Sequence, residues 1–384
     1  MVMRLLHTAD WHLGRSFHGA SLIDAQAAWG AWLVDVARDQ QVDAILVSGD
    51  VYDRALPSVD AVRLAGELLA RLVQVAPVIV ISGNHDSPTR LGFGAELLTR
   101  AGLHVRTEVA SVGTPVLVGE TAVYPIPYLE PDVARGPLDV PARGHAAVLN
   151  AATQRIRADL ASRPAGTRSV VLAHAFVAGA DTSPSERDLT VGGSACVPAS
   201  VFAGIDYVAL GHLHAPQRAG ANARYAGSPV AFSFSEAAHR KSVALVQLDG
   251  ARGRGGGFSY ELLECPVARP LAVLSGRLEE LLADDALTIH ETSWAQVTLT
   301  DAVRPVDAMA RIRARFPHAL VLAFEPEGAA ARDASSYAVR LRGMDDRQLA
   351  AAFVEDVRGE GPCPQEQALL DDALAARRLA EAVA

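Results

Sequence analysis

The chain has 384 residues, half of them apolar and 21% charged, so it has room for roughly two or three domains and is too apolar to be disordered. Its net charge of −9 provides no general attraction for nucleic acid, although bound divalent metals would add positive charge that the sequence does not display. No apolar run reaches the roughly 18–20 residues of a membrane span, and His7 and Asp10 interrupt the N-terminal apolar stretch. We therefore expect a cytoplasmic protein with neither a membrane anchor nor a signal peptide.

Short apolar runs that end in polar residues dominate the N-terminal part of the chain. Runs of this kind, bounded by Gly or Ser, are typical of buried strands, and here they cover residues 4–7, 44–47, 78–81, 169–172 and 207–210. Helical patterns at roughly 22–39 and 59–75 separate the first three runs, which predicts parallel strands joined by helical crossovers. In open α/β sheets the ligands bind beyond the carboxyl ends of the strands. We therefore expect the polar residues that follow these runs to gather at one edge.

The pattern changes in the C-terminal part. Residues 220–265 alternate short strands with Gly-rich turns, which predicts an antiparallel closing sheet. Residues 271–340 contain the alternating Val297 and Leu299, a helix near 306–316 and a strand at 319–324, so a small separate α+β unit is expected. Residues 345–383 are predicted to form two amphipathic helices, interrupted at 359–364. Their narrow apolar stripes either pack on each other or bind a partner.

Cysteine and lysine usage excludes several classes of site. The three cysteines are far apart and form no CxxC pair, so neither a disulfide framework nor a zinc knuckle is expected. Lys241 is the only lysine, and Arg240 precedes it, so no GxxxxGK phosphate loop exists. The chain itself therefore offers no ATP site of that type.

The polar residues after the strands belong to five short motifs, DWH, GDVYD, GNHD, a lone HAF and GHLH. In an extended backbone, residues i and i+2 point the same way, so Asp10 and His12 could share one cation, as could His212 and His214. Each motif alone has an ordinary structural explanation: a capping Asp, an Asx turn, or a satisfied core histidine at His174. Together, and each behind a strand, they favour a metal centre.

This series of motifs resembles the calcineurin-like metallophosphoesterase superfamily. The longer segments HTADWHLGR, GDVYDRA, GNHDSPTRL, HAFVAGADTSPSER and YAGSPVAFSFSE resemble, more closely, the nuclease subunits of bacterial SbcC–SbcD double-strand-break repair complexes, over about residues 1–240. The resemblance implies an α/β fold: a two-sheet β-sandwich flanked by helices, followed by a small α+β capping domain and C-terminal helices. It implies domains at residues 1–268 (nuclease), 269–342 (DNA-binding cap) and 343–384 (helical segment that binds the ATPase).

The resemblance also implies the roles of individual residues. One metal would be held by Asp10, His12, Asp50 and His214, and the other by Asp50, Asn84, His174 and His212, with Asp50 as the bridge. His85 would contact the phosphate, and Asp53 would orient its imidazole. Oxygen and imidazole ligands without thiolate suit manganese or iron better than structural zinc, so we expect two divalent cations of the Mn²⁺ type.

The resulting functional hypothesis is a manganese-dependent DNA nuclease. It combines 3′→5′ double-strand exonuclease and endonuclease activity and acts on DNA ends with a coiled-coil ATPase of the SbcC type, as a homodimer without membrane contact. One alternative is a stand-alone phosphatase or cyclic-nucleotide phosphodiesterase with the same metal core. Another is a DNA-end tether whose metal site has decayed, although the intact set of candidate ligands argues against it. The long extension beyond residue 270 favours the nuclease, because a small substrate needs only the core.

Overall fold

The computed structural model describes residues 2–183, 185–186, 196–250, 257–327 and 344–383. The chain divides into two compact units, Met1–Ala272 and Val273–Ala384. The predicted boundary between residues 342 and 343 lies outside the described residues.

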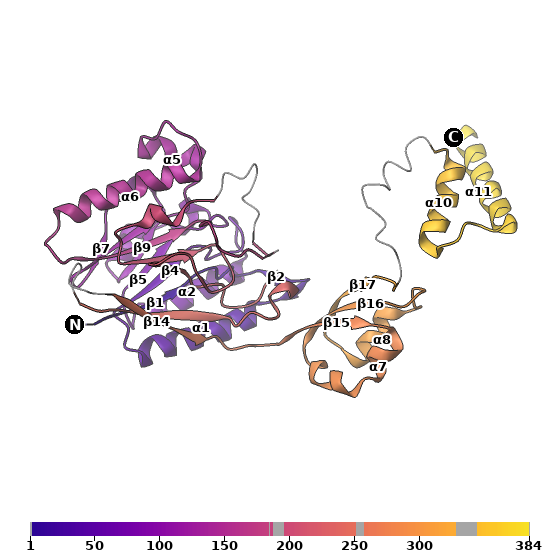
Figure 1. Cartoon of the computed structure of the whole chain (residues 1–384), viewed down its shortest axis with the longest axis horizontal. Coiled ribbons are helices and arrows are strands. Elements are labelled where there is room, and N and C mark those ends of the chain that lie inside the picture. The colour runs from indigo at the N-terminus through magenta and orange to yellow at the C-terminus, as the bar shows by residue number, and fades with distance from the viewer. Residues whose placement is uncertain (1, 184, 187–195, 251–256, 328–343, 384) are drawn as a thin grey trace. The chain divides into compact units, whose positions relative to one another are not determined.

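Two six-stranded sheets form the centre of the first unit (Figure 1). The first sheet has four parallel strands at its centre and edge, extended on the other side by an antiparallel hairpin. Its order is β14 (Phe258–Glu264), β13 (Ser242–Leu248), β1 (Met3–Thr8), β4 (Ala44–Ser48), β5 (Val78–Ile81) and β6 (Leu103–Arg106).

The second sheet faces the first. Its inner strands are parallel, and a short antiparallel strand closes each edge. Its order is β11 (Gln217–Arg218), β12 (Ala223–Tyr225), β10 (Tyr207–Gly211), β9 (Arg168–His174), β8 (Thr121–Ile126) and β7 (Val116–Val118). The segment 220–265 therefore does not form one closing sheet, because β12 joins the second sheet and the β13–β14 hairpin joins the first.

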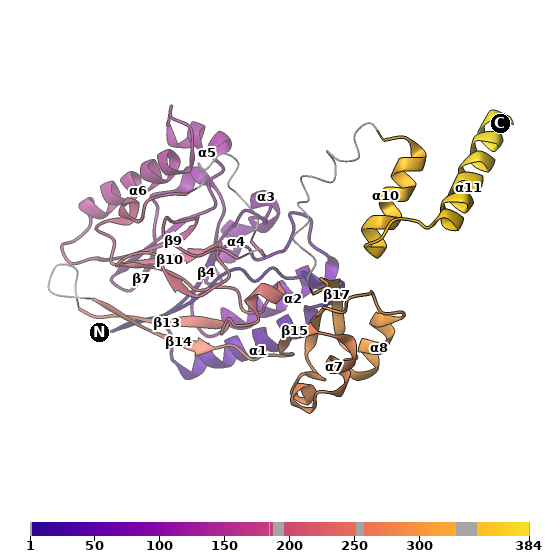
Figure 2. The same cartoon turned by 45° about the vertical axis from the view of Figure 1, so that its right-hand side comes forward.

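Helices cover the outer face of each sheet, so the first unit has four layers. Helices α1 (Ile23–Asp39) and α2 (Val59–Leu72) cover the first sheet, and α5 (Pro131–Leu138) and α6 (His145–Ser162) cover the second (Figure 2). Strand β4 shows the cause: Ile45 and Val47 pack under the helices, whereas Leu46 packs between the sheets. A strand buried on both faces has a continuous apolar run rather than an alternating one.

Short elements connect these layers. They are β2 (Ser16–Phe17), β3 (Ala20–Ser21), α3 (Pro88–Leu91), α4 (Ala95–Thr99) and the 3-10 turns η1 (Val109–Ser111), η3 (Ala199–Phe202) and η4 (Phe234–Glu236). The predicted α/β class, with a two-sheet sandwich flanked by helices, is confirmed. The five predicted strands do not share one sheet edge, contrary to what the sequence suggested. Strands β1, β4 and β5 belong to the first sheet, and β9 and β10 belong to the second.

The second unit begins with a three-stranded sheet in the order β15 (Leu271–Gly276), β16 (Trp294–Leu299) and β17 (Ala319–Phe324). Helices α7 (Leu278–Ala283) and α8 (Ala308–Arg315) and the 3-10 turn η5 (Asp285–His290) connect the strands.

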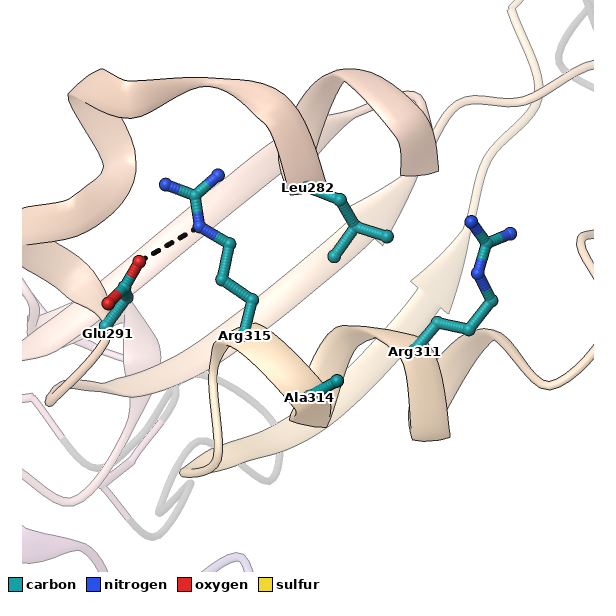
Figure 3. A pocket seen from close by; sticks show the side chains of 5 residues that line it. All are labelled: Leu282, Glu291, Arg311, Ala314 and Arg315. Atoms are coloured by element: carbon teal, nitrogen blue, oxygen red, sulfur yellow. Dashed lines mark hydrogen bonds and ion pairs between the residues drawn. The ribbon is translucent and has the colours of Figure 1, made fainter.

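A hollow of about 480 Å³ lies beside α8, lined by Leu282, Glu291, Arg311, Ala314 and Arg315 (Figure 3). Arg315 forms an ion pair with Glu291 (3.1 Å) and donates to the carbonyls of Leu281 and Asp284. Its guanidinium therefore joins α7, η5 and α8.

Two helices, α10 (Asp346–Arg358) and α11 (Pro364–Val383), end the chain. A capping box between Asp345 and Gln348 starts α10. Ion pairs Arg347–Asp371 (2.7 Å) and Arg358–Glu366 (2.7 Å) join the two helices. Leu349 and Val354 of α10 are half-buried, whereas Phe353 is 61% and Val357 71% exposed, so part of the apolar surface of α10 stays uncovered. None of the described helices is both long and apolar enough to cross a membrane.

Candidate metal centre

The seven candidate ligands lie together where strands of the two sheets end. Asp10 and His12 follow β1, Asp50 follows β4, and Asn84 follows β5 in the first sheet, whereas His174 ends β9 and His212 and His214 follow β10 in the second. All are buried except Asn84, which is half-buried. The site is thus formed by both sheets, and neither sheet supplies it alone.

The backbone at this edge is unusual. Asp10, His12, Asp50 and His212 have φ values of 53°, 42°, 50° and 107°, in a region that side-chain-bearing residues rarely adopt. Each such residue costs on the order of 1–3 kcal/mol, and such conformations persist where surrounding structure enforces them. The expectation that Asp10 and His12 share a direction because their backbone is extended is therefore wrong. Tight turns after the strands bring the two side chains together.

His12 and His214 form the first part of the site. Their Nε2 atoms lie 3.2 Å apart, and Asp50 Oδ2 is 3.6 Å from His12 Nε2. Asp10, His12 and His214 each offer a ligand atom within 4.8 Å of the others. The carboxylate of Asp10 also accepts from the backbone N–H of His212 (2.9 Å), which ties the loop after β1 to the loop after β10.

Asp50, Asn84, His174 and His212 form the second part. His174 Nδ1 donates to the carbonyl of Ser48 (2.9 Å), so its Nε2 faces Asp50 Oδ2 at 3.4 Å and Asn84 Oδ1 at 2.9 Å. His212 Nδ1 lies 3.2 Å from the same Asn84 oxygen. The oxygen Oδ2 of Asp50 therefore faces His12 on one side and His174 on the other, between the two parts of the site.

Burial and charge set the protonation of these groups. Burial lowers the pKa of His12 and His214, and it lowers the pKa of His212 to about 3, so these imidazoles are neutral near pH 7. Burial also raises the pKa of Asp10 well above its usual range. His174 differs: burial acts to lower its pKa, but the carboxylates of Asp50 and Asp10 raise it to about 9. His174 in turn holds the pKa of Asp50 well below its usual range, against the effect of burial.

The donor set fits divalent cations. Two neutral imidazoles face each other through Nε2, carboxylate and amide oxygens converge beside them, and none of the seven candidate ligands is a thiolate, which suits Mn²⁺ or Fe²⁺. Glycines make this approach possible, since a Cβ at Gly83 would overlap the Asp50 side chain and one at Gly211 would overlap the Ser48 carbonyl. A cation here would replace the proton that His174 holds against Asp50.

His85 lies at the rim of the site. Its Nδ1 donates to the backbone carbonyl of Asp53 (2.8 Å), and its backbone N–H donates to Asp50 Oδ1 (2.9 Å). The expected contact between His85 and Asp53 thus comes from the Asp53 backbone. The Asp53 carboxylate lies elsewhere, 3.8 Å from His12 Nδ1 and 3.7 Å from Arg15 Nε. His85 also offers a ligand atom within 4.8 Å of His12 and Asp50.

Asp86 is a buried residue that is absent from the candidates expected from the sequence. Its carboxylate accepts from the backbone N–H groups of Val51 (3.1 Å), Tyr52 (2.9 Å) and Gly83 (2.9 Å). Asp86 thus fastens the loop after β4 to the loop after β5, and burial with the nearby charge of Asp50 raises its pKa to about 7. Its position at the end of the GNHD motif indicates a functional residue. The motif does not show whether that carboxylate binds metal or holds two loops together.

Comparisons with known proteins show the family to which the chain belongs. Residues 3–216 match the model of the calcineurin-like phosphoesterase family, and because this match covers more than half of the chain, the chain belongs to that family of hydrolytic phosphodiesterases. Residues 267–358 match a second model, described as the type 5 capsule protein repressor C-terminal domain.

The chain is also similar, along nearly its whole length, to a curated SbcD nuclease subunit. It is 27% identical over 365 residues to the SbcD subunit of the SbcCD nuclease of Staphylococcus saprophyticus, and the match covers 93% of this chain and 94% of that relative. Among solved structures, the crystal structure of TT1561 of Thermus thermophilus aligns with 67% of this chain and 99% of its own, at 15% identity and a TM-score of 0.37.

Proposed function

We propose that the chain is a manganese-dependent DNA nuclease, with 3′→5′ exonuclease activity on double strands and endonuclease activity on single strands. The observation that carries the proposal is the convergence of Asp10, His12, Asp50, Asn84, His174, His212 and His214 at one edge of the sandwich, in a chain homologous to SbcD nucleases along 93% of its length. We place its action in the cytoplasm, as part of an ATP-dependent complex that processes broken DNA ends.

The assigned ligands divide into two sets around Asp50. Asp10, His12, Asp50 and His214 would hold one divalent cation and Asp50, Asn84, His174 and His212 the other. Two such cations polarise a phosphodiester, supply hydroxide at neutral pH and stabilise an in-line displacement. Asp10 and Asp50 would bring two negative charges to the site, and two divalent cations would bring four positive charges. The site would therefore stay cationic and attract a phosphodiester despite the net charge of the chain.

His85 is assigned to the phosphate. Its Nδ1 must carry a proton, because the Asp53 carbonyl to which it is bonded only accepts. Its Nε2 can then donate to a phosphate oxygen or to the leaving oxygen only when the ring is an imidazolium. The Asp53 backbone fixes the ring in place, so this chain positions the proton without using the Asp53 carboxylate.

Cleavage of linear duplex DNA tests the function. We expect the purified chain to degrade a linear duplex from its 3′ ends with Mn²⁺, to lose activity with EDTA and to recover it when Mn²⁺ is returned. A chain that hydrolyses bis-p-nitrophenyl phosphate or cyclic nucleotides but leaves DNA intact would contradict the nuclease and support the small-substrate phosphodiesterase.

We assign residues 1–268 to the nuclease domain, 269–342 to a DNA-binding cap and 343–384 to the binding of a coiled-coil ATPase of the SbcC type. The apolar residues of α10 support the last assignment, because Phe353 and Val357 are spaced i, i+4 and stay exposed although α11 is joined to α10 by ion pairs. Such i, i+4 anchors are what an amphipathic helix presents to a groove.

Removal of residues 343–384 should leave a folded, Mn²⁺-dependent nuclease that no longer binds the ATPase or responds to ATP. The double variant Phe353→Asp/Val357→Asp should do the same with a full-length chain, because two charges would be placed in the apolar contact. Binding of the ATPase is measured by co-elution in size-exclusion chromatography. Val303→Asp, at an exposed apolar residue of the second unit, is the matched control and should still co-elute. Continued co-elution of both the truncated chain and the double variant would contradict the assignment.

A homodimer is proposed through α2 rather than α1. Trp29 and Leu33 of α1 are buried between this helix and the first sheet, whereas Val59 and Val62 of α2 are exposed. We expect a dimer at micromolar concentration by light scattering and a monomer for Val59→Glu/Val62→Glu. Val133→Glu, the same change at an exposed valine of α5, should stay dimeric. A monomeric wild-type chain would contradict the proposal.

A further inference from the structure

Lys241 is unusual in both composition and position. The chain has 35 basic residues, and all but Lys241 are arginines. Lys241 precedes β13 and its side chain is only 6% exposed, against a Glu236 side chain that is fully buried. A chain that uses arginine everywhere else retains lysine at one of its most enclosed positions, which indicates a task that a guanidinium cannot perform.

The surroundings of the ammonium show what that task is. Its three hydrogens have three acceptors: the backbone carbonyl of His214 (3.0 Å), Ser228 Oγ (2.9 Å) and the carboxylate of Glu236. Ser228 gives its own proton to the carbonyl of Val230 (2.8 Å), so its hydroxyl oxygen accepts from the ammonium. A compact ammonium satisfies this set completely, whereas an arginine would bring five donors in a planar fork and leave some of them buried without acceptors.

Two of these partners lead directly to a candidate metal ligand. Lys241 donates to the carbonyl of His214. The hydrogen-bond partner of His214 Nδ1 is Ser185 Oγ (2.7 Å), and Glu236 Oε1 lies beside the same nitrogen at 3.6 Å, as an ion-pair neighbour. The same Glu236 oxygen accepts from the backbone N–H of Phe232 (3.3 Å), whose ring packs against those of His12 and His214. The backbone and the Nδ1 side of His214 are therefore fixed, and Nε2 remains the atom that faces His12.

We propose that the buried Lys241–Glu236 pair is a positioning device that fixes the ring of His214, and so sets the metal affinity of the site to which His214 belongs. This rests on the proposed function, since His214 must be a ligand. Outer partners that orient a ligating histidine typically change metal affinity about 10- to 100-fold when they are removed. Here the pair acts through the His214 carbonyl and through Phe232, whose ring packs on that of His214. The effect should be confined to the cation held with Asp10 and His12 and should spare the one held with His174.

The test is a calorimetric titration of the chelator-treated full chain with Mn²⁺ alone. We expect wild type to bind two Mn²⁺, and Lys241→Met/Glu236→Gln to bind one of them normally and the other about 10- to 100-fold more weakly. The double variant removes both charges, so no unpaired buried charge complicates the comparison. Lys241→Arg should weaken the same single site, because charge alone does not restore the three contacts. Arg240→Met, next in sequence but exposed and paired with Glu264, is the control and should match wild type.

A purely structural role would give a different pattern. It would lower the unfolding midpoint in EDTA and either leave both Mn²⁺ affinities unchanged or weaken them equally, and each of these results would overturn the proposal. Recovery by Lys241→Arg would overturn it as well. If the double variant does not fold, Ser228→Ala removes one contact of the ammonium and should weaken the same site to a smaller extent, and equal Mn²⁺ binding there would overturn the proposal.

The environment of the Lys241 ammonium can also be measured without metal, because Lys241 is the only lysine in the chain. Labelling with ¹⁵N-lysine should give one ammonium signal, slowed in exchange by its three acceptors, and Glu236→Gln should shift it. Fast exchange typical of an exposed lysine would overturn the proposal. A wild-type chain that binds two Mn²⁺ but cleaves no DNA would contradict only the nuclease function, because DNA enters none of these measurements.

Discussion

Asp50→Ala is expected to lower the rate of DNA cleavage by more than about 10³-fold and to remove both Mn²⁺ ions. Asp50 Oδ2 lies 3.6 Å from His12 Nε2 and 3.4 Å from His174 Nε2, so one oxygen faces both parts of the site. A carboxylate in that place serves two cations, and its loss should weaken both. Metal content of the purified variant and its rate on linear duplex DNA measure the effect.

Two companion variants sharpen this expectation. Asp50→Asn keeps an acceptor for the backbone N–H of His85 but removes the charge, so it should also lose metal while the loop stays in place. Asp35→Ala, in an exposed ion pair with Arg38 on α1, should keep wild-type metal content and rate. Near wild-type metal content in Asp50→Ala would show that Asp50 is not the bridging ligand.

His85→Leu is expected to keep both metals and to lose cleavage by roughly 10²–10⁴-fold, the usual contribution of a positioned proton donor. The ring lies at the rim, with Nδ1 held by the Asp53 carbonyl, and its loss removes no contact among the seven assigned ligands. Binding of an uncleaved DNA duplex should persist. Parallel measurements of Mn²⁺ content, DNA affinity and single-turnover rate separate these three effects.

The contrary outcome is specific, because His85 also lies within ligand distance of His12 and Asp50. A His85→Leu protein that loses a metal ion would place His85 among the ligands and end its assignment to the phosphate. His104→Leu, a half-buried histidine on β6, serves as the control for removal of an imidazole and should retain metal and activity.

Local patterns in the amino-acid sequence were sufficient to find the candidate ligands and the strands that carry them. Apolar runs such as residues 44–47 and 78–81 are buried on both faces, so their continuous apolar composition identifies them as strands. The polar residues that come next in the sequence therefore lie at the ends of these strands. The helices expected at 22–39 and 59–75 correspond to α1 and α2 within a few residues, because amphipathic periodicity is a local property. The α/β class therefore follows from these patterns without knowledge of the three-dimensional arrangement.

How these pieces meet depends on contacts between distant parts of the chain. Pairing of β12 with β10, and of β13 with β1, joins segments that no local pattern assigns to one sheet or the other. The turns at Asp10, His12, Asp50 and His212 adopt φ values that the residues themselves disfavour, so their shape is enforced by the packing of two sheets rather than by sequence preference. Lys241 and Glu236 are only five residues apart, but their burial beside His214, which lies more than twenty residues earlier in the chain, depends on the whole fold.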